Sequence, residues 1–385
     1  MPADSMSDPV SDSVSNSAAA NANASEAATV ESLDALRAQI DRIDGELLER
    51  LAERARLAQR VGEWKKHNDA PVMRPEREAQ ILARLRARNP GPLSGEAIEA
   101  IWREIISGCR DLERRVRIAY LGPPGTFSEQ ALLAHFGSSV DAIACASIDE
   151  VFRSVEVGGA DFGVVPVENS SEGAVSRTLD LLLQTSLTIS GEISLPVRQN
   201  LMRLEASMDG IERIVSHAQS LAQCARWLDA HAHGVERVPV ASNAEAARLA
   251  SLDARTAAIA GEHAAARYGL QIVATGIQDD PHNRTRFAVI GEYACGPSGA
   301  DQTSVILSVP DRAGAVHAMI EPLARHGVSM KRFESRPSRQ GLWEYLFYID
   351  LIGHRDDPAV AAALREMAAQ SSFCKIVGSY PRAAA

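Results

Sequence analysis

The stretch that decides the fold of the central region reads RIAYLGPPGTFS and covers residues 117–128. Its first five residues form a predicted apolar strand, and the glycines and prolines that follow favour a tight turn. Thr126 or Ser128 can cap a helix expected from Glu129, whose amino end favours an anion. A strand, a turn and a helix in this order are typical of an α/β domain. The two prolines have no N–H group and argue against a nucleotide-binding loop.

Two further predicted strands are each followed by polar residues. The strand at 162–167 precedes ENSSEG, and the strand at 211–215 precedes SHAQ and a helix that carries Gln223 and Cys224. Apolar strands at 256–260 and 270–274, with a helical segment at 261–268, continue the alternation. Polar groups at the carboxyl ends of several strands predict a ligand crevice in an α/β sheet. His217, taken by itself, is more simply explained as a helix-capping or packed residue than as a catalytic base.

The next polar run in this region is NRTRF at residues 283–287. It puts the hydroxyl of Thr285 between the guanidinium groups of Arg284 and Arg286. A Thr beside two Arg residues at a loop-to-strand junction can hold a carboxylate and aim a donor at a leaving group. If this run stood alone, the simpler interpretation would be that it is the exposed, positively charged beginning of a strand.

Residues 33–66 contain no proline and predict one long helix. At ~1.5 Å per residue it is about 50 Å long and needs a partner helix, most simply from a second copy of the chain. Its spacing of three and four defines a heptad seam, formed by Arg37, Ile40, Asp44, Leu47, Leu51, Arg54, Ala58, Val61 and Lys65. Charges in a buried seam must be paired or hold a ligand. Asp44 lies in the same seam and could be the structural partner of one of these cations.

Spacing along this helix separates its cations into two groups. Arg54 and Lys65 are about 16 Å apart and can lean toward one small molecule, whereas Arg37 lies a further 25 Å or so away. Arg37 would therefore have to act on a site of the partner chain. Second and third helices are expected at 76–88 and 95–113, beyond a link that contains Pro71 and Pro75.

The carboxyl-terminal segment predicts a small α+β domain. Strands are expected at 303–309, 328–333, 342–349 and 373–379, with helices at 313–326 and 358–368. The order β-α-β-β-α-β is the ferredoxin-like arrangement. Order alone gives no function.

Composition bounds the class of protein. The 385 residues suffice for two or three domains, and the formal charge of −10 argues against nucleic acid as a partner. The five scattered cysteines predict neither a disulfide framework nor a zinc site and fit a cytoplasmic protein. Residues 1–30, without Lys or Arg, are expected to be a disordered tail. No apolar run approaches the roughly 18 residues of a membrane span, and no cofactor or metal is expected.

These segments together resemble the bifunctional chorismate mutase/prephenate dehydratase family. Residues 283–287 resemble the Thr-Arg-Phe signature of its dehydratase, and the three helices look like the all-helical mutase. The segments 314–316 and 334–337 resemble the two phenylalanine-binding motifs of ACT domains. The resemblance implies a multi-domain protein: an all-α mutase dimer unit at 31–115, a two-lobed α/β dehydratase domain at 116–293 and an α+β ferredoxin-like ACT domain at 300–385.

The resemblance also implies roles for individual residues. In the mutase, Arg37 is supplied by the partner chain, and Glu113 lies near the ether oxygen of the substrate. The pocket is lined by Arg54, Lys65, Arg77 and Glu78. In the dehydratase, Thr285 donates to the leaving hydroxyl, Arg286 clamps a carboxylate, and Glu168 or a water supplies the proton. The same cleft contains Thr126, Asn169, Ser170, Ser216, Gln223 and Phe287. Phenylalanine would contact Gly314, Ala315, Val316, Glu334, Ser335, Arg336 and Pro337.

The implied function is conversion of chorismate to prephenate and then to phenylpyruvate in L-phenylalanine biosynthesis, with feedback inhibition by phenylalanine. The implied assembly is a homodimer or a higher homo-oligomer. Three alternatives stay open at this point. The chain could be a non-catalytic sensor of aromatic amino acids, its helical unit could serve only to dimerise a dehydratase, or arogenate could replace prephenate as substrate.

Overall fold

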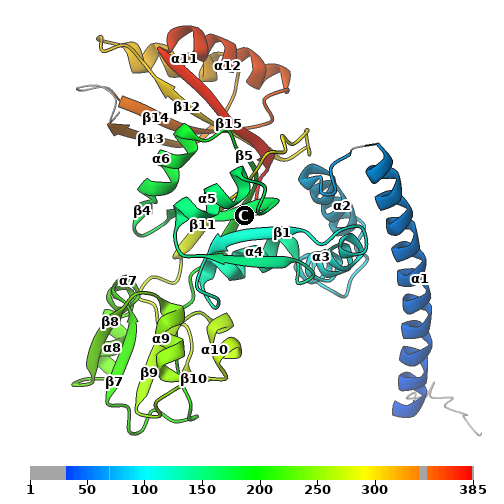
Figure 1. Ribbon diagram of the computed structural model, residues 1–385, viewed down its shortest axis with the longest axis vertical. Coiled ribbons are helices and arrows are strands. Elements are labelled where there is room, and N and C mark those ends of the chain that lie inside the picture. Colours follow the sequence, from blue (N-terminus) through cyan, green and yellow to red (C-terminus); the bar gives the residue numbers. More distant parts are fainter. Residues whose placement is uncertain (1–31, 69, 338–344, 384–385) are drawn as a thin grey trace, which may run out of the picture. The chain divides into compact units, whose positions relative to one another are not determined.

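The computed structural model describes residues 32–68, 70–337 and 345–383 (Figure 1). The expected tail at 1–30 and the first residues of the strand expected at 342–349 lie outside these ranges. The chain divides into two compact units, residues 1–51 and 52–385, and the dividing point lies within helix α1 (Leu33–His67).

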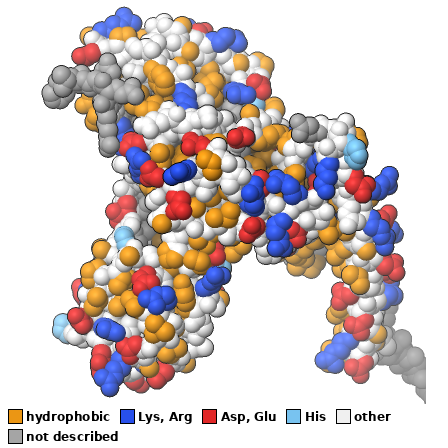
Figure 2. Space-filling view, in the orientation of Figure 1, with side chains coloured by type: hydrophobic (Ala, Val, Ile, Leu, Met, Phe, Trp, Pro, Cys, Tyr) orange, Lys and Arg blue, Asp and Glu red, His pale blue; other side chains and the backbone are white. Residues whose placement is uncertain are grey.

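The amino-terminal region is helical, as its sequence predicts. It consists of α1, α2 (Pro75–Ala87) and α3 (Gly95–Asp111). Proline suits the first turn of α2, and the hydroxyl of Ser94 caps α3 by accepting from Ala97 N at 3.1 Å. Figure 2 shows charged side chains of both signs along α1, with hydrophobic ones among them. Within the first unit, the exposed apolar side chains are Leu33, Leu36, Ile40, Ile43, Leu47, Leu48 and Leu51.

Lobe 1 of the central region is built on a mixed sheet in the order β2-β1-β3-β11-β5, with β4 paired to β3. Strands β1, β2 and β3 are parallel, whereas β11 runs antiparallel to both of its neighbours. The elements are β1 (Arg117–Leu121), α4 (Phe127–Phe136), β2 (Asp141–Cys145), α5 (Ile148–Glu156), β3 (Phe162–Asn169), β4 (Gly173–Ala174), α6 (Ser176–Gln184), β5 (Thr188–Pro196) and β11 (Arg284–Gly291).

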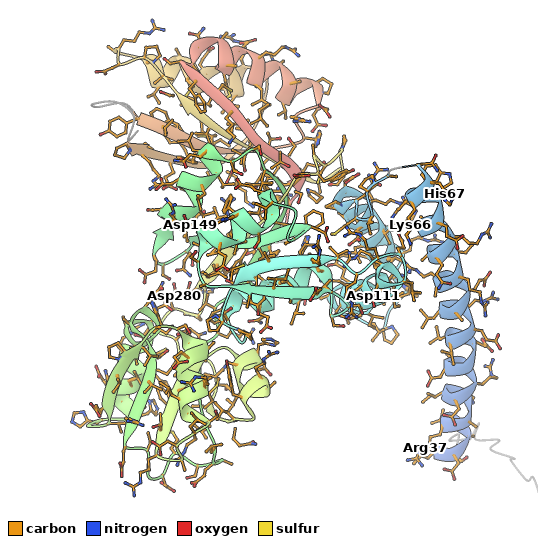
Figure 3. The ribbon with its side chains drawn as sticks, in the orientation of Figure 1. Arg37, Lys66, His67, Asp111, Asp149 and Asp280 are labelled. Carbon is orange, nitrogen blue, oxygen red and sulfur yellow. The ribbon has the colours of Figure 1, made fainter. Side chains whose placement is uncertain are left out.

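Lobe 2 is inserted between β5 and β11, so the chain crosses between the lobes at 197–199 and again at 275–283, the segment of Asp280 (Figure 3). Its sheet has the order β10-β6-β9-β7-β8. The elements are β6 (Asn200–Arg203), β7 (Arg213–His217), α7 (Ala218–Gln223), α8 (Ala225–His231), β8 (Glu236–Val240), α9 (Asn243–Ala250), β9 (Thr256–Ala260), α10 (Glu262–Tyr268) and β10 (Gln271–Ala274).

The carboxyl-terminal domain has the predicted β-α-β-β-α-β order, with an antiparallel sheet β13-β14-β12-β15. Its elements are β12 (Asp301–Ser308), α11 (Ala315–Arg325), β13 (Met330–Pro337), β14 (Tyr345–Ile352), α12 (Pro358–Gln370) and β15 (Phe373–Pro381). Because strand side chains alternate, Val305 and Ile349 pack on the helices, whereas Ile306 and Tyr348 face the other way.

The second face of this sheet packs on lobe 1. Ile306, Tyr348 and Val377 share one buried core with Val165 and Ile290 of the lobe 1 sheet. The carboxyl-terminal domain and lobe 1 are therefore one packed body.

Candidate functional site

A cleft of about 670 Å³ lies between the two lobes. The carboxyl ends of β1 and β3 open into it from lobe 1, and those of β7 and β8 open into it from lobe 2, as expected for a ligand crevice in α/β sheets. Its polar lining comes from Thr126, Ser128, Asn169, Gln199, His217, Gln219, Ser220, Gln223, Ser242, Asn243, Glu245 and Thr285.

Thr285 and Asn169 meet in this cleft from the neighbouring strands β11 and β3. The amide Nδ2 of Asn169 donates to Thr285 Oγ1 at 2.9 Å and to Asn283 Oδ1 at 2.8 Å. Asn169 Oδ1 in turn accepts from the backbone N–H groups of Ser171 and Glu172. Since the Thr285 oxygen already accepts a hydrogen bond, its own O–H remains to donate to a ligand.

An anion in this cleft would be held by neutral donors. The described lining residues include neither Lys nor Arg. Helices α4 and α9 begin at the cleft, capped by the hydroxyls of Thr126 and Ser242, and helix amino ends attract negative charge. Gln223 and the buried ring of Phe287 complete the predicted residues found here.

Arg286 and Glu168 do not line this cleft, contrary to the roles implied for them. They lie on the opposite face of the lobe 1 sheet, around a separate cavity of about 220 Å³ that Arg284 also lines. Successive side chains of a strand point to opposite faces, so Thr285 and Arg286 cannot reach the same ligand. Arg286 as carboxylate clamp and Glu168 as proton source in the cleft are therefore wrong.

Two predicted cleft residues, the buried Ser216 and the exposed Ser170, are not among the residues that line it. Ser216 is fully buried, with its hydroxyl 2.7 Å from Ile259 O and 3.0 Å from Asn243 Oδ1. Ser170 Oγ accepts from Arg284 N at 3.0 Å. Ser216 thus holds the lining residue Asn243, and Ser170 holds the backbone at Arg284.

Eight polar lining residues were missing from the sequence-based set: Ser128, Gln199, His217, Gln219, Ser220, Ser242, Asn243 and Glu245. Asn243 Oδ1 accepts from Ser216, Ser220 and the backbone N–H of His217, which leaves its NH₂ group for a ligand. Asn243 follows the carboxyl end of β8. The expectation that polar residues after strand ends line the crevice could therefore have identified it from the sequence. His217 both caps α7 and lines the cleft. Gln199 lies at a lobe crossing, where no sequence pattern marked it.

A buried carboxylate fixes the loop that carries Thr126. Glu129 Oε2 accepts from Gly125 N at 2.6 Å and lies 3.0 Å from Nε2 of His263, which belongs to α10 of lobe 2. Burial would raise the pKa of Glu129, but the hydrogen bonds to His263 and Gly125, with Arg267 nearby, outweigh it and lower the pKa. The contact therefore links the two lobes beside the cleft.

In the helical region, Lys65 and Glu113 come together. Lys65 Nζ donates to Glu113 Oε2 at 2.9 Å and to Val72 O at 2.7 Å, and the two side chains are 18% and 10% exposed. Gly62 makes this possible, since a Cβ there would clash with the side chain of Glu113. A partly buried Lys–Glu pair offers one cation and one carboxyl group to a ligand.

The other predicted mutase residues are dispersed in a single chain. Arg37 is exposed near the amino end of α1 (Figure 3) and lies 3.5 Å from Asp34. Arg54 is half-buried and Arg77 is exposed, while Glu78 accepts from the buried Arg110 at 2.7 Å.

The two motifs of the carboxyl-terminal domain lie at the start of α11 and the end of β13. Gly314 has a positive φ of 79° as the residue before α11, a conformation that glycine adopts without strain. Ala315 is buried, and Val316 is 36% exposed. On β13, Glu334 pairs with Arg332, and Ser335 and Pro337 are exposed. Arg336 instead reaches lobe 1, where it contacts Asp180 at 3.0 Å and Ser176 O at 2.9 Å.

Membrane-spanning helices and metal sites are both absent from the part of the chain that the structure describes. None of its helices combines the length and apolar character needed to cross a bilayer. Within the same part, no group of three or more His, Cys, Asp or Glu side chains is arranged to hold a metal ion.

Three family models match the chain in order. Residues 36–114 match chorismate mutase type II, residues 118–294 match prephenate dehydratase, and residues 303–369 match the ACT domain. Together with the two-lobed cleft, these matches define an enzyme that combines a chorismate mutase with a prephenate dehydratase and carries an ACT domain.

Relatives match nearly the whole length. The chain is 49% identical over 350 residues to the bifunctional chorismate mutase/prephenate dehydratase of Neisseria gonorrhoeae, covering 90% of this chain and 96% of the relative. It is 42% identical to that of Aquifex aeolicus, covering 92% and 99%. A prephenate dehydratase from Arthrobacter aurescens, solved in complex with L-Phe, matches with a TM-score of 0.64 and 36% identity over 69% of this chain and 90% of that one. The chain belongs to the bifunctional chorismate mutase/prephenate dehydratase family.

Proposed function

We propose that the cleft converts prephenate to phenylpyruvate, with Thr285 as the hydrogen-bond donor to the departing ring hydroxyl. The observation that carries this proposal is the 2.9 Å hydrogen bond from Asn169 Nδ2 to Thr285 Oγ1, which leaves the Thr285 O–H free to donate to a ligand in the cleft. Loss of CO₂ and of the hydroxyl makes the ring aromatic, so the protein has to hold the substrate and assist the leaving group. Helix amino ends and the amides of Gln223 and Asn243 would hold its carboxylates.

The proton reaches the leaving oxygen through Thr285 or a water in the cleft. An unassisted hydroxyl is a weak acid, and Glu168 lies on the far face of the sheet. The ring of Phe287 supplies an apolar wall for the substrate ring. Ser216 and Ser170 act in this proposal by holding Asn243 and the backbone at Arg284.

The proposal assigns prephenate formation from chorismate to the helical domain. Its rearrangement is unimolecular, so cations that hold the compact dicarboxylate conformer accelerate it. Lys65 and Glu113, which are in contact, form the centre of this proposed site, with Arg54, Arg77 and Glu78 as its further pocket residues and Arg37 supplied by the partner chain of a dimer. The exposed apolar stripe of α1 supports such a dimer, because it exceeds what a single chain covers.

The remaining parts of the proposal concern pathway, regulation and location. The protein acts in L-phenylalanine biosynthesis in the cytoplasm, and its cysteines are free thiols, which suits a reducing compartment. Phenylalanine inhibits the dehydratase through the segments 314–316 and 334–337. The L-Phe complex of the Arthrobacter aurescens relative supports this effector. The domain limits 31–115, 116–293 and 300–385 are supported by the three matched ranges.

One assay tests the whole proposal. Purified full-length protein is incubated with chorismate, and prephenate and phenylpyruvate are followed separately, with and without phenylalanine. We expect transient prephenate, then phenylpyruvate, and slower phenylpyruvate formation when phenylalanine is present. A protein that binds phenylalanine but consumes neither substrate would be a sensor.

A further inference from the structure

Arg286 is tied to the carboxyl-terminal domain although its neighbour Thr285 lines the cleft. Its Nη1 donates to Asp350 Oδ2 at 2.7 Å and to Glu192 Oε1 at 3.3 Å, and its Nε lies 3.6 Å from Glu168 Oε2. The side chains of Arg286, Glu192 and Asp350 are 18%, 6% and 4% exposed. Burial disfavours the charged guanidinium, but the attraction of Asp350 and its neighbours outweighs this and raises the pKa of Arg286. The guanidinium therefore stays charged.

Asp350 is itself fixed by three strands of the carboxyl-terminal sheet. It lies on β14, and its Oδ1 accepts from Ser304 Oγ on β12. That hydroxyl lies 2.7 Å from Tyr380 OH on β15, which accepts from Gln302 Nε2 at 3.0 Å. All members of this chain of hydrogen bonds are buried. Asp350 therefore presents a rigid anchor to lobe 1.

The backbone of β11 is paired irregularly on its β3 side at this point. The pairing of β11 with β3 shifts register between Arg286 and Phe287, where Val167 of β3 is skipped, so this ladder is interrupted directly after Arg286, whereas the pairing of β11 with β5 continues through both residues. Such an irregularity can re-aim side chains, and it interrupts the ladder of hydrogen bonds on the β3 side. An ionic contact from Arg286 can supply a constraint at this point.

We propose that Arg286 is a positioning residue for the dehydratase: its bond to Asp350 fixes β11 from behind the sheet and so sets the place of the Thr285 hydroxyl in the cleft. The inference rests on the proposed role of Thr285. It makes the carboxyl-terminal domain part of the geometry of the reaction, in addition to its regulatory role.

The test compares two variants of the full-length protein at the same packed surface. Asp350→Asn weakens the anchor, whereas Tyr348→Phe removes a hydroxyl that donates to Leu179 O in α6 at 3.2 Å and takes no part in the Arg286–Asp350 contact. We expect Asp350→Asn to lower kcat for prephenate by about 10-fold or more, because small displacements of a reacting group are costly. KM for prephenate should change by less than about two-fold, since the lost interaction acts in the transition state. Tyr348→Phe should keep the wild-type kcat.

Mutase activity serves as the folding control, and Ser304→Ala is the second variant. Ser304→Ala frees Asp350 without leaving a charge unpaired, so it should lower kcat in the same direction by a smaller factor. Wild-type kcat in a folded Asp350→Asn protein, or equal losses in Asp350→Asn and Tyr348→Phe, would overturn the positioning role. A wild-type protein without dehydratase activity would overturn the proposed function, and this inference with it.

Discussion

At the scale of single residues, the role of the Thr285 hydroxyl is the part of the proposal that one substitution tests most directly. Thr285→Ala removes the O–H that Asn169 orients, so phenylpyruvate formation should fall by roughly 10²–10³-fold, the usual loss for one preorganised donor. Chorismate consumption should continue near the wild-type rate, because Lys65 and Glu113 belong to a different domain. Following both reactions in one sample checks this, and Thr285→Ser, which restores a hydroxyl, is the matched control. Equal loss of both activities in a folded variant would contradict the two-site interpretation.

Glu129 predicts a pH dependence of stability. Its pKa is lowered from the ordinary 4.5, so its ionised form stabilises the folded state above that value, and the stabilisation is lost as pH falls through the lowered pKa. Glu129→Gln should therefore lower the midpoint of thermal unfolding at neutral pH, and the difference from wild type should shrink steadily below pH 4.5. A difference that stayed constant down to about pH 3 would show that ionisation of Glu129 does not stabilise the fold.

The residue scale also shows how far sequence reasoning reached. Thr285, Asn169, Thr126 and Gln223 were placed in one cleft by resemblance to the family, and the structure brings them there. The misplacement of Arg286 was avoidable, because the two-residue period of a strand already separates it from Thr285. The Asn169–Thr285 contact was not derivable from periodicity, since it joins residues 116 positions apart through the pairing of β3 with β11.

At the scale of elements, the contact of β15 with β5 depends on one glycine. A Cβ at Gly378 would clash with the backbone carbonyl of Ile189. Gly378→Ala should lower the free energy of unfolding by roughly 1–3 kcal/mol, as overpacking of a tight contact does. Urea unfolding followed by fluorescence measures it. Gly108→Ala in α3 is the control, because the nearest atom to its added Cβ is Ser139 Oγ at 3.9 Å. If both variants lost the same free energy of unfolding, the clash at Gly378 would not be the cause.

Most helices and strands were predictable because their signals are local. The helix predicted at 33–66 is observed at Leu33–His67, and the strand predicted at 256–260 has those bounds. Ends were less accurate: the strand expected at 211–215 is β7, Arg213–His217. The insertion of lobe 2 between β5 and β11 left no local signal, because it is defined by pairing between distant strands.

At the scale of the whole molecule, the carboxyl-terminal domain is packed into the dehydratase region rather than merely appended to it. It shares a buried core with lobe 1, and its strand β13 touches that lobe at two points. Arg332 lies 3.3 Å from Glu168, the residue before Asn169, and Arg336 pairs with Asp180 in α6. A change at the proposed effector motif therefore has a direct physical route to the cleft. Removing the domain would also expose the apolar face of lobe 1, so regulation is better tested in the full chain.

The proposed dimer gives the last prediction. Arg37 lies far along α1 from Arg54, so each mutase pocket should take Arg54 from its own chain and Arg37 from the partner. Arg37→Ala and Arg54→Ala should each be inactive as mutases, yet their heterodimer contains one pocket with both arginines. After random subunit exchange, half of the dimers are mixed, so about a quarter of the wild-type mutase sites should return. Mutase rates before and after exchange measure this, with dehydratase activity as the control for intact protein. No recovery after exchange confirmed by mass spectrometry would mean that each pocket is built from one chain.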